Sequence, residues 1–461
     1  MWGLRVGNLQ AVTVAVLALA LISSVAVMSL KFGIHRTPSI TGVTFLSVFA
    51  AHGVTAIPWS IGWLGGDYYL FPTPSPDYPW VVGTSFVGFV VGALAAARFQ
   101  SFDLQDAQTR FANDRLGRGR VIFVVLAVVV VLVAFVAIWL TLLPAAAAIL
   151  TLAGRSPDAI TQFRFGSGAV FGLLAYPLSI FATVVGPLLL LTTINVVRMS
   201  RGVERGAALF LIGALSLALL LTVASTLQRA PVVMLFLFVM ASFYLSSRRY
   251  PAVDRRVAVV AAAVVVIVGT AAYVATTSLN VFDSARFVFD RVFLIPQQAL
   301  DAFLHVYPNE IPYSMGLGVG LFARFAGVTD YQMPALLVGY MSTGSARVDL
   351  DCFWACDLWA NFGYAGVAIG SVFVGALVVS LDRWCLRVMK RTAVGSALYA
   401  FMLVQSIQMV HLSVFTMLLS GGFVIAPLVA WLLEGPRVGW TRRTRSERED
   451  QEWTGARGST S

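Results

Sequence analysis

Residues 278–325 read SLNVFDSARFVFDRVFLIPQQALDAFLHVYPNEIPYSMGLGVGLFARF and begin a connection of mixed polarity that covers residues 277–362. On both sides of it the chain consists mainly of Ala, Val, Leu, Ile and Phe runs, which are separated by short Arg clusters. Connections longer than about 15 residues are uncommon unless they are functional or disordered. This one contains too many apolar residues to be disordered, so we expect it to hold functional residues.

The composition is typical of a membrane protein. Of the 461 residues, 58% are hydrophobic and 12% are charged, and the mean hydropathy is +0.83, whereas soluble domains carry about 25% charged residues. Because backbone polar groups inside lipid must be satisfied internally, we expect an all-α polytopic membrane protein. About eleven apolar runs (10–12) are long enough to span a bilayer, at 9–30, 40–64, 81–97, 121–142, 169–197, 206–226, 231–247, 257–276, 363–381, 396–415 and 417–434.

The distribution of basic residues predicts the orientation. Of the 32 Lys and Arg residues, 24 lie in alternate connections or in the C-terminal tail, and such clusters face the cytoplasm. We therefore expect residues 1–276 to form eight spans with short loops, 277–362 to be extracytoplasmic, 363–434 to form the last spans, and 435–461 to be a disordered cytoplasmic tail. Eleven spans put the N-terminus outside, and one further helix near 142–152 would reverse that. The basic residues behind the net charge of +10 set the orientation of the chain in the membrane, so this charge does not indicate a nucleic-acid partner.

Arginines in the predicted outer connections are candidate phosphate ligands. Arg229 lies in a very short turn between two spans, Arg291 in an amphipathic stretch of the long connection, and Arg164 in another outer loop. An arginine beside lipid is costly unless it is paired, and guanidinium groups bind phosphate through two parallel hydrogen bonds. Together these arginines would hold the diphosphate of a lipid carrier. The alternative is local pairing, of Arg291 with Asp290 and of Arg164 with Asp158.

Acidic and aromatic side chains around the long connection are candidate glycan ligands. Glu310 precedes Tyr313, which suits the floor of a sugar site, and a carboxylate that faces a hydroxyl can act as a general base. Asp357 and Asn361 share one helical face just before the next span. Trp359 suits either stacking on a sugar ring or an interfacial aromatic belt. A solvated loop acid is the alternative for Glu310.

Neither a metal nor a cofactor is expected. Four scattered His residues have no ligand spacing, and the GxGxG at 316–320 follows no strand, so it is a weak nucleotide signal. Cys352 and Cys356 are four residues apart, and adjacent helical turns hold Cβ atoms farther apart than a relaxed disulfide prefers. We therefore expect free thiols there. His411 lies near the outer end of a span, where it is either a catalytic base or a packed side chain.

Three segments together resemble the Wzy-type oligosaccharide repeat-unit polymerases, which belong to the O-antigen polymerase and ligase superfamily. They are LQRAPVVMLFLFVMASFYL (227–245), FDRVFLIPQQALDAFLHVYPNEIPYSMGLGVG (289–320) and DLWANFGYAGVAIGSVFVGALV (357–378), within a resemblance that covers about 155–427. It implies a C-type glycosyltransferase of the bacterial cytoplasmic membrane that joins glycan repeats carried on undecaprenyl diphosphate. Such an enzyme needs no cofactor, because the diphosphate–sugar bond supplies the energy.

The resemblance also implies residue roles and partners. Arg229 and Arg291 fall where family arginines hold the diphosphate, and Arg164 matches less closely. In related ligases a His in the large outer loop deprotonates the acceptor hydroxyl. His305 lies in the matching region, and Glu310 and Asp357 are alternatives. The expected partners are undecaprenyl-diphosphate-linked oligosaccharide, membrane lipid, a flippase and a chain-length regulator. The family commonly has about twelve spans with both ends inside, which differs from the eleven counted here.

Two alternative functions remain at this level. A glycan ligase of the same superfamily shares the donor and the phosphate ligands, so the sequence barely separates it from a polymerase. A transporter or flippase for lipid-linked sugars would line its spans with charges, and no internal repeat indicates an inverted-repeat transporter. Mid-span charges are almost absent and polar residues concentrate in the predicted outer connections, which favours surface chemistry over translocation.

Overall fold

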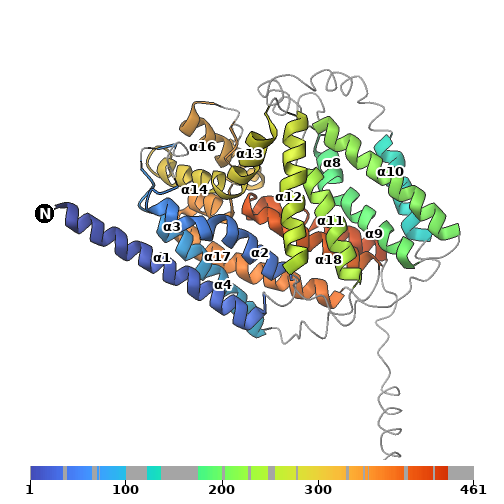
Figure 1. Cartoon of the computed structure of the whole chain (residues 1–461), viewed down its shortest axis with the longest axis horizontal. Coiled ribbons are helices and arrows are strands. Elements are labelled where there is room, and N and C mark those ends of the chain that lie inside the picture. The colour runs from blue at the N-terminus through green and yellow to red at the C-terminus, as the bar shows by residue number, and fades with distance from the viewer. Residues whose placement is uncertain are drawn as a thin grey trace, which may run out of the picture.

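The computed structural model describes residues 2–34, 39–64, 70–71, 73–99, 122–136, 175–199, 203–226, 230–247, 255–276, 279–328, 332–345, 348–350, 352–388, 393–418 and 421–434. Within these ranges every regular element is a helix and no strand occurs, so the all-α prediction is confirmed. The tail at 435–461 and most of the cytoplasmic loop predicted at 99–120 lie outside the described residues. Figure 1 shows the helices packed into one bundle.

Within the described ranges, the bundle contains seven helical segments that are long and apolar enough to cross a membrane. Its elements are α1 (Trp2–Phe32), α2 (Ile40–Val48), η1 (Phe49–Gly53), α3 (Val54–Ser60), α4 (Tyr78–Phe99), α8 (Ala175–Ile180), η5 (Phe181–Val185), α9 (Gly186–Met199), α10 (Val203–Thr226), α11 (Ala230–Ser247), α12 (Arg255–Thr276), α17 (Trp354–Val388), α18 (Ala393–Gln405), η6 (Ser406–Val410), α19 (Val414–Leu418) and α20 (Ile425–Glu434). Shorter apolar helices at Ile122–Val136, Pro231–Leu245 and Val259–Val274 coincide with three more predicted spans. The last predicted span, 417–434, is broken between α19 and α20, and the count of eleven is not confirmed.

Arginine-rich helix ends meet at one end of the bundle, which we call the basic end. Arg383 of α17 donates from Nη1 to the carbonyl oxygen of Ala97 at the end of α4, at 3.1 Å. Next to it, Asp382 accepts hydrogen bonds from the backbone N–H and the hydroxyl of Thr41 at the start of α2, at 3.1 and 2.9 Å. Tyr399 at the start of α18 donates to the same carboxylate at 3.0 Å. Helix ends that the arginine pattern assigns to one side therefore do lie together, whereas the side of the membrane they face stays a prediction.

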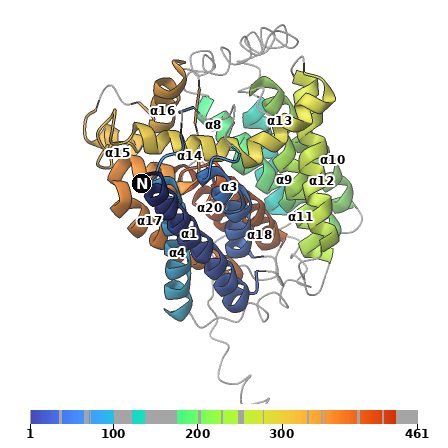
Figure 2. The same ribbon diagram turned by 60° about the vertical axis from the view of Figure 1, so that its left-hand side comes forward.

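The long connection folds into four short helices over the opposite end of the bundle. These cover helices are α13 (Val281–Phe293), α14 (Ile295–Val306), α15 (Gly320–Phe325) and α16 (Pro334–Thr343). The Asn280 side chain accepts the N–H of Asp283 at 2.9 Å and begins α13, and Pro296 suits the first turn of α14. In Figure 2, α14 runs across the view while α1 and α4 run steeply away from it. We call this side the cover end.

Helix α17 folds back on itself at Gly363, whose φ of 60° and ψ of −146° are not helical. The Trp354 indole N–H donates to the Ser371 hydroxyl at 3.0 Å. In one straight helix these residues, 17 positions apart, would lie about 25 Å from each other. The arm 354–362 therefore lies beside the arm 364–388. Its tip enters the bundle as far as Phe89, near the middle of α4, whose ring stacks on Trp354 with centroids 5.6 Å apart.

Glycines let α17 and α4 approach closely. A Cβ added to Gly92 would lie 1.8 Å from the carbonyl oxygen of Val372, and one added to Gly375 would lie 2.0 Å from that of Phe89. Small residues at such crossings are typical of closely packed membrane helices.

The expectation of free thiols at Cys352 and Cys356 is wrong, because the structure joins them in a disulfide with Cα atoms 6.1 Å apart. Cys352 precedes the helix, which begins at Trp354. Its backbone is therefore free to bend toward Cys356, and the helical spacing that argued against a disulfide does not apply.

Candidate functional site

Three polar side chains follow one face of α14 toward the cover end of the bundle. Gln297, Asp301 and His305 are spaced by four residues, and Gln297 and Asp301 are buried. The Gln297 amide donates to the carbonyl oxygen of Ala51 and to the hydroxyl of Thr55, and its oxygen accepts from the hydroxyl of Tyr78. Because buried polar groups are costly unless they are hydrogen-bonded, these bonds fix α14 against η1, α3 and α4.

Asp301 and Phe71 hold the imidazole of His305 in one orientation. Its Nδ1 lies 2.9 Å from the backbone carbonyl oxygen of Asp301. A carbonyl only accepts, so Nδ1 carries the proton and Nε2 is left as a base. The ring stacks on Phe71 with centroids 4.2 Å apart and planes 3° apart. The His305 side chain is 23% exposed, so the imidazole is partly open to the surface.

The Asp301 carboxylate lies behind this imidazole. Its Oδ1 is 3.7 Å from His305 Nδ1 and accepts the backbone N–H of Ser75 at 2.7 Å. Burial raises the pKa of Asp301 to about 6, although the Ser75 N–H and the nearby His305 act in the opposite direction. A partly exposed imidazole whose other nitrogen is oriented by a buried group is the usual arrangement of a general base.

The residues expected to bind glycan lie together, but they differ in exposure. Tyr313 and Trp359 meet edge to face with centroids 5.9 Å apart. Trp359 is only 1% exposed, and its indole N–H donates to the carbonyl oxygen of Tyr307 at 3.0 Å. Its ring therefore supports Tyr313 from behind and has no free face for stacking on a sugar. Tyr313 is half-buried and lies closer to the surface.

Asn361 clamps the loop after α14 to α17. Its side-chain oxygen accepts the N–H groups of Gly316 and Gly318, both at 3.1 Å, and its amide donates to the carbonyl oxygen of Asp357 at 2.7 Å. The predicted relation between Asp357 and Asn361 along the helix is thus present. All of these contacts are with protein groups, so the structure gives Asn361 a structural role.

The two candidate acids of the sequence prediction differ in position. Glu310 is exposed in the turn that follows α14, and its backbone N–H bonds to the carbonyl oxygen of Val306 at 2.9 Å. Asp357 is half-buried in the re-entrant arm of α17. Within the part of the chain that is described, neither carboxylate contacts the imidazole of His305. His305 with Asp301 is therefore the best-formed acid–base pair of this region.

Arg291 is exposed on α13, and in the described ranges it makes neither an ion pair nor a hydrogen bond. The local alternative does not occur, because Asp290 pairs with Arg286 at 3.8 Å. His411 lies close enough to respond to Arg291: burial, and secondarily the charge of Arg291, lower the pKa of His411 to about 4. Among the described residues, Arg291 is thus a cation that is available for an anion, and its charge acts on the imidazole of His411.

Some of the predicted residues cannot be placed. Arg229 and Arg164 lie outside the described residues, so the convergence of three arginines stays a prediction. Among the described residues, no group of three or more His, Cys, Asp or Glu side chains could hold a metal ion.

Sequence reasoning missed the connection between α3 and α4. It supplies Phe71, Ser75 and Asp77 to the cover end, where their partners on α14 and α17 lie more than 220 residues later in the chain. Its aromatic, proline and aspartate residues could have marked it as functional, because a connection between two spans rarely needs such residues. Comparisons with protein-family models, curated proteins and solved structures find no match to this chain.

Proposed function

We propose that this chain is a membrane glycosyltransferase that polymerises oligosaccharide repeats carried on undecaprenyl diphosphate. The observation that carries the proposal is the orientation of His305 by Asp301 and Phe71 at the partly exposed cover end. A glycosyl transfer needs a base for the acceptor hydroxyl and a group that stabilises the leaving diphosphate. The cover helices supply both types of group, on α14 and on α13.

In the proposed reaction the acceptor oxygen forms a bond to the anomeric carbon of the donor. The bond between that carbon and the diphosphate oxygen breaks, and the diphosphate leaves with the electron pair. The proton of the acceptor hydroxyl passes to Nε2 of His305. Arg291 binds the diphosphate, because a guanidinium stays charged and matches phosphate oxygens in pairs. The choice of polymerisation over a single transfer rests on the family resemblance.

The test is chain elongation by the purified full chain in lipid vesicles with undecaprenyl-diphosphate-linked repeats, read as product length on a gel. We expect a ladder from the native chain and none from Arg291→Ala. Arg286→Ala is the matched control, because Arg286 lies on the same helix but already pairs with Asp290. A ladder from Arg291→Ala equal to that of the control would refute the role of Arg291. A single product means a ligase, and an unchanged substrate means that the enzymatic proposal is wrong.

The base is assigned by comparing His305→Asn with His411→Asn. We expect His305→Asn to abolish elongation and His411→Asn to retain it. The reverse result would move the base to the imidazole beside Arg291 and leave the proposed reaction class in place. Insertion of each variant into the vesicles is measured in parallel, so that loss of activity is separated from loss of protein.

A further inference from the structure

The apex of the α17 hairpin gathers aromatic rings around a carboxylate. Gly363 has a positive φ, and a Cβ there would lie 2.9 Å from the hydroxyl oxygen and from the Cζ of Tyr313. Glycine therefore allows both the reversal of the chain and the close approach of the Tyr313 ring. The next residue, Tyr364, donates from its hydroxyl to Oδ1 of Asp77 at 2.5 Å. Burial, and secondarily the charge of Asp77, raise the pKa of Tyr313.

This cluster is open on one side and supported on the other. Tyr364 is 43% exposed, and Asp77 and Tyr313 are half-buried. Buried Trp359 meets both tyrosines edge to face, at 5.9 and 4.8 Å between centroids. Rings held rigidly beside a carboxylate with an unused oxygen match the chemistry of a sugar, whose C–H face packs on a ring and whose hydroxyls donate to the carboxylate.

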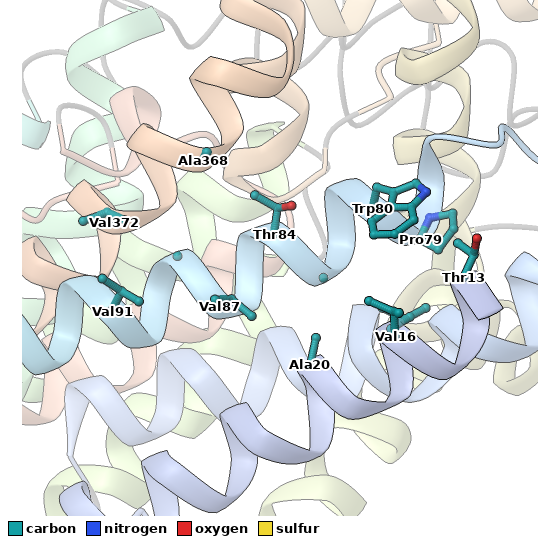
Figure 3. A pocket seen from close by; sticks show the side chains of 13 residues that line it. Thr13, Val16, Ala20, Pro79, Trp80, Thr84, Val87, Val91, Ala368 and Val372 are labelled. Carbon is teal, nitrogen blue, oxygen red and sulfur yellow. The ribbon is translucent and has the colours of Figure 1, made fainter.

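An apolar groove of about 380 Å³ lies between α1, α4 and α17. Figure 3 shows Trp80, Pro79 and Thr13 at one end, and Val91 and Val372 at the other. The end at Pro79 is two residues from Asp77, and Ala368, which lines the groove, is one helical turn after Tyr364. The walls include exposed apolar side chains, such as Val91 at 49% exposure. In a membrane this groove faces lipid.

We propose that the groove and the cluster together bind a lipid with an uncharged sugar headgroup. The chain of the lipid lies along Val91 and Val372, and the sugar rests against Tyr364 and Tyr313 with its hydroxyls on Asp77. The residues that line the groove include neither Lys nor Arg, and the carboxylate at its end repels a phosphate. A lipid diphosphate is therefore disfavoured here, and this site is distinct from the one proposed at Arg291.

The experiment measures lipids retained by the full chain when it is released from nanodiscs into a native mass spectrometer. The nanodiscs contain phosphatidylcholine with either monogalactosyl diacylglycerol or phosphatidylglycerol as the probe. We expect preferential retention of the galactolipid. Tyr364→Phe removes the hydrogen bond that orients the Asp77 carboxylate toward the sugar, so we expect a loss of about fivefold, the ratio that one hydrogen bond contributes. Asp77→Asn should show a similar loss.

Two further variants separate the parts of the site. Tyr340→Phe is the matched control, because Tyr340 is also half exposed, on α16, and should retain the galactolipid fully. Gly83→Leu places a side chain in the groove, where the nearest atoms to a Cβ are 3.7 Å away, and should reduce retention while Asp77 and Tyr364 are unchanged. Equal retention of both probes, preference for phosphatidylglycerol, or full retention by Tyr364→Phe and Asp77→Asn would overturn the proposal. Retention is read without any elongation, so it stands or fails independently of the glycosyltransferase activity.

Discussion

Replacement of Gly375 by Ala tests whether the glycine crossing of α17 and α4 supports the fold. The new Cβ would lie 2.0 Å from the carbonyl oxygen of Phe89, and ordinary contact begins near 3.4 Å, so the two backbones must separate by 1.4 Å. Overpacking typically costs about 1–3 kcal/mol. A clash with backbone belongs at the upper end, because the backbone cannot rotate away as a side chain can. Alanine recovers about 1 kcal/mol of helix propensity, which leaves a net loss of about 2 kcal/mol.

The assay is thermal unfolding of the detergent-solubilised protein, followed by tryptophan fluorescence. Gly206→Ala is the matched control, because Gly206 lies in helix α10 with nothing within 4 Å of its added Cβ. We expect Gly375→Ala to melt at a lower temperature than the native chain, and Gly206→Ala to melt at the same temperature or higher. Equal melting of both variants would show that the α17 and α4 backbones are not in close contact.

Two further predictions concern titration and disulfide chemistry. Because burial raises the pKa of Asp301 from 3.8 to about 6, the folded state holds this proton more tightly, and stability contributed by Asp301 falls as pH rises through this range. The pKa of His411 is shifted in the opposite direction, so the test compares the melting temperature of Asp301→Asn with that of the native chain at pH 5 and at pH 7.5. Relative to the native chain, the variant should be more stable at pH 7.5 than at pH 5. An equal difference in melting temperature at the two pH values would contradict the assignment to Asp301. Maleimide labelling of the denatured, unreduced protein should modify one cysteine rather than three, because Cys352 and Cys356 are joined; three labels would exclude the disulfide.

Hydropathy predicts most of the bundle because it reports a local property, the length of an apolar run. The positions of the arginines predict the basic end, since arginines such as Arg383 lie at the ends of these apolar runs. It does not predict the hairpin in α17, because one backbone conformation at Gly363 reverses the chain while the apolar pattern continues unchanged. The sequence shows glycines suited to close packing, and only the structure shows that Gly366 and Gly370 pack against Leu358 of the same helix.

The sequence predicts the chemical types of residue in the candidate site better than it predicts the individual residues. His305 and Tyr313 belong to the region that the sequence indicates, because they lie in the one long connection. Asp301 and Asp77 were not selected, since their importance depends on contacts with segments more than 220 residues away. Trp359 is buried, although the sequence indicates an exposed role for it. An aromatic residue near the end of a span looks the same in sequence whether it faces solvent or supports another ring.

The disulfide bears on which end of the bundle faces the oxidising side. Disulfides persist mainly outside the reducing cytosol. The Cys352–Cys356 disulfide is buried at the tip of the shorter arm of α17, and the chain reaches this tip from α16 at the cover end. The arginine pattern independently predicts that the basic end faces the cytoplasm. Thiol oxidation and the positive charge of cytoplasmic connections are unrelated properties, and both favour the orientation predicted from the sequence, with the cover end outside the cytoplasm. Both are consistent with a site at the cover end that acts on substrates outside the cytoplasm, where nucleotide-activated sugars are absent and a lipid diphosphate must supply the energy of the proposed transfer.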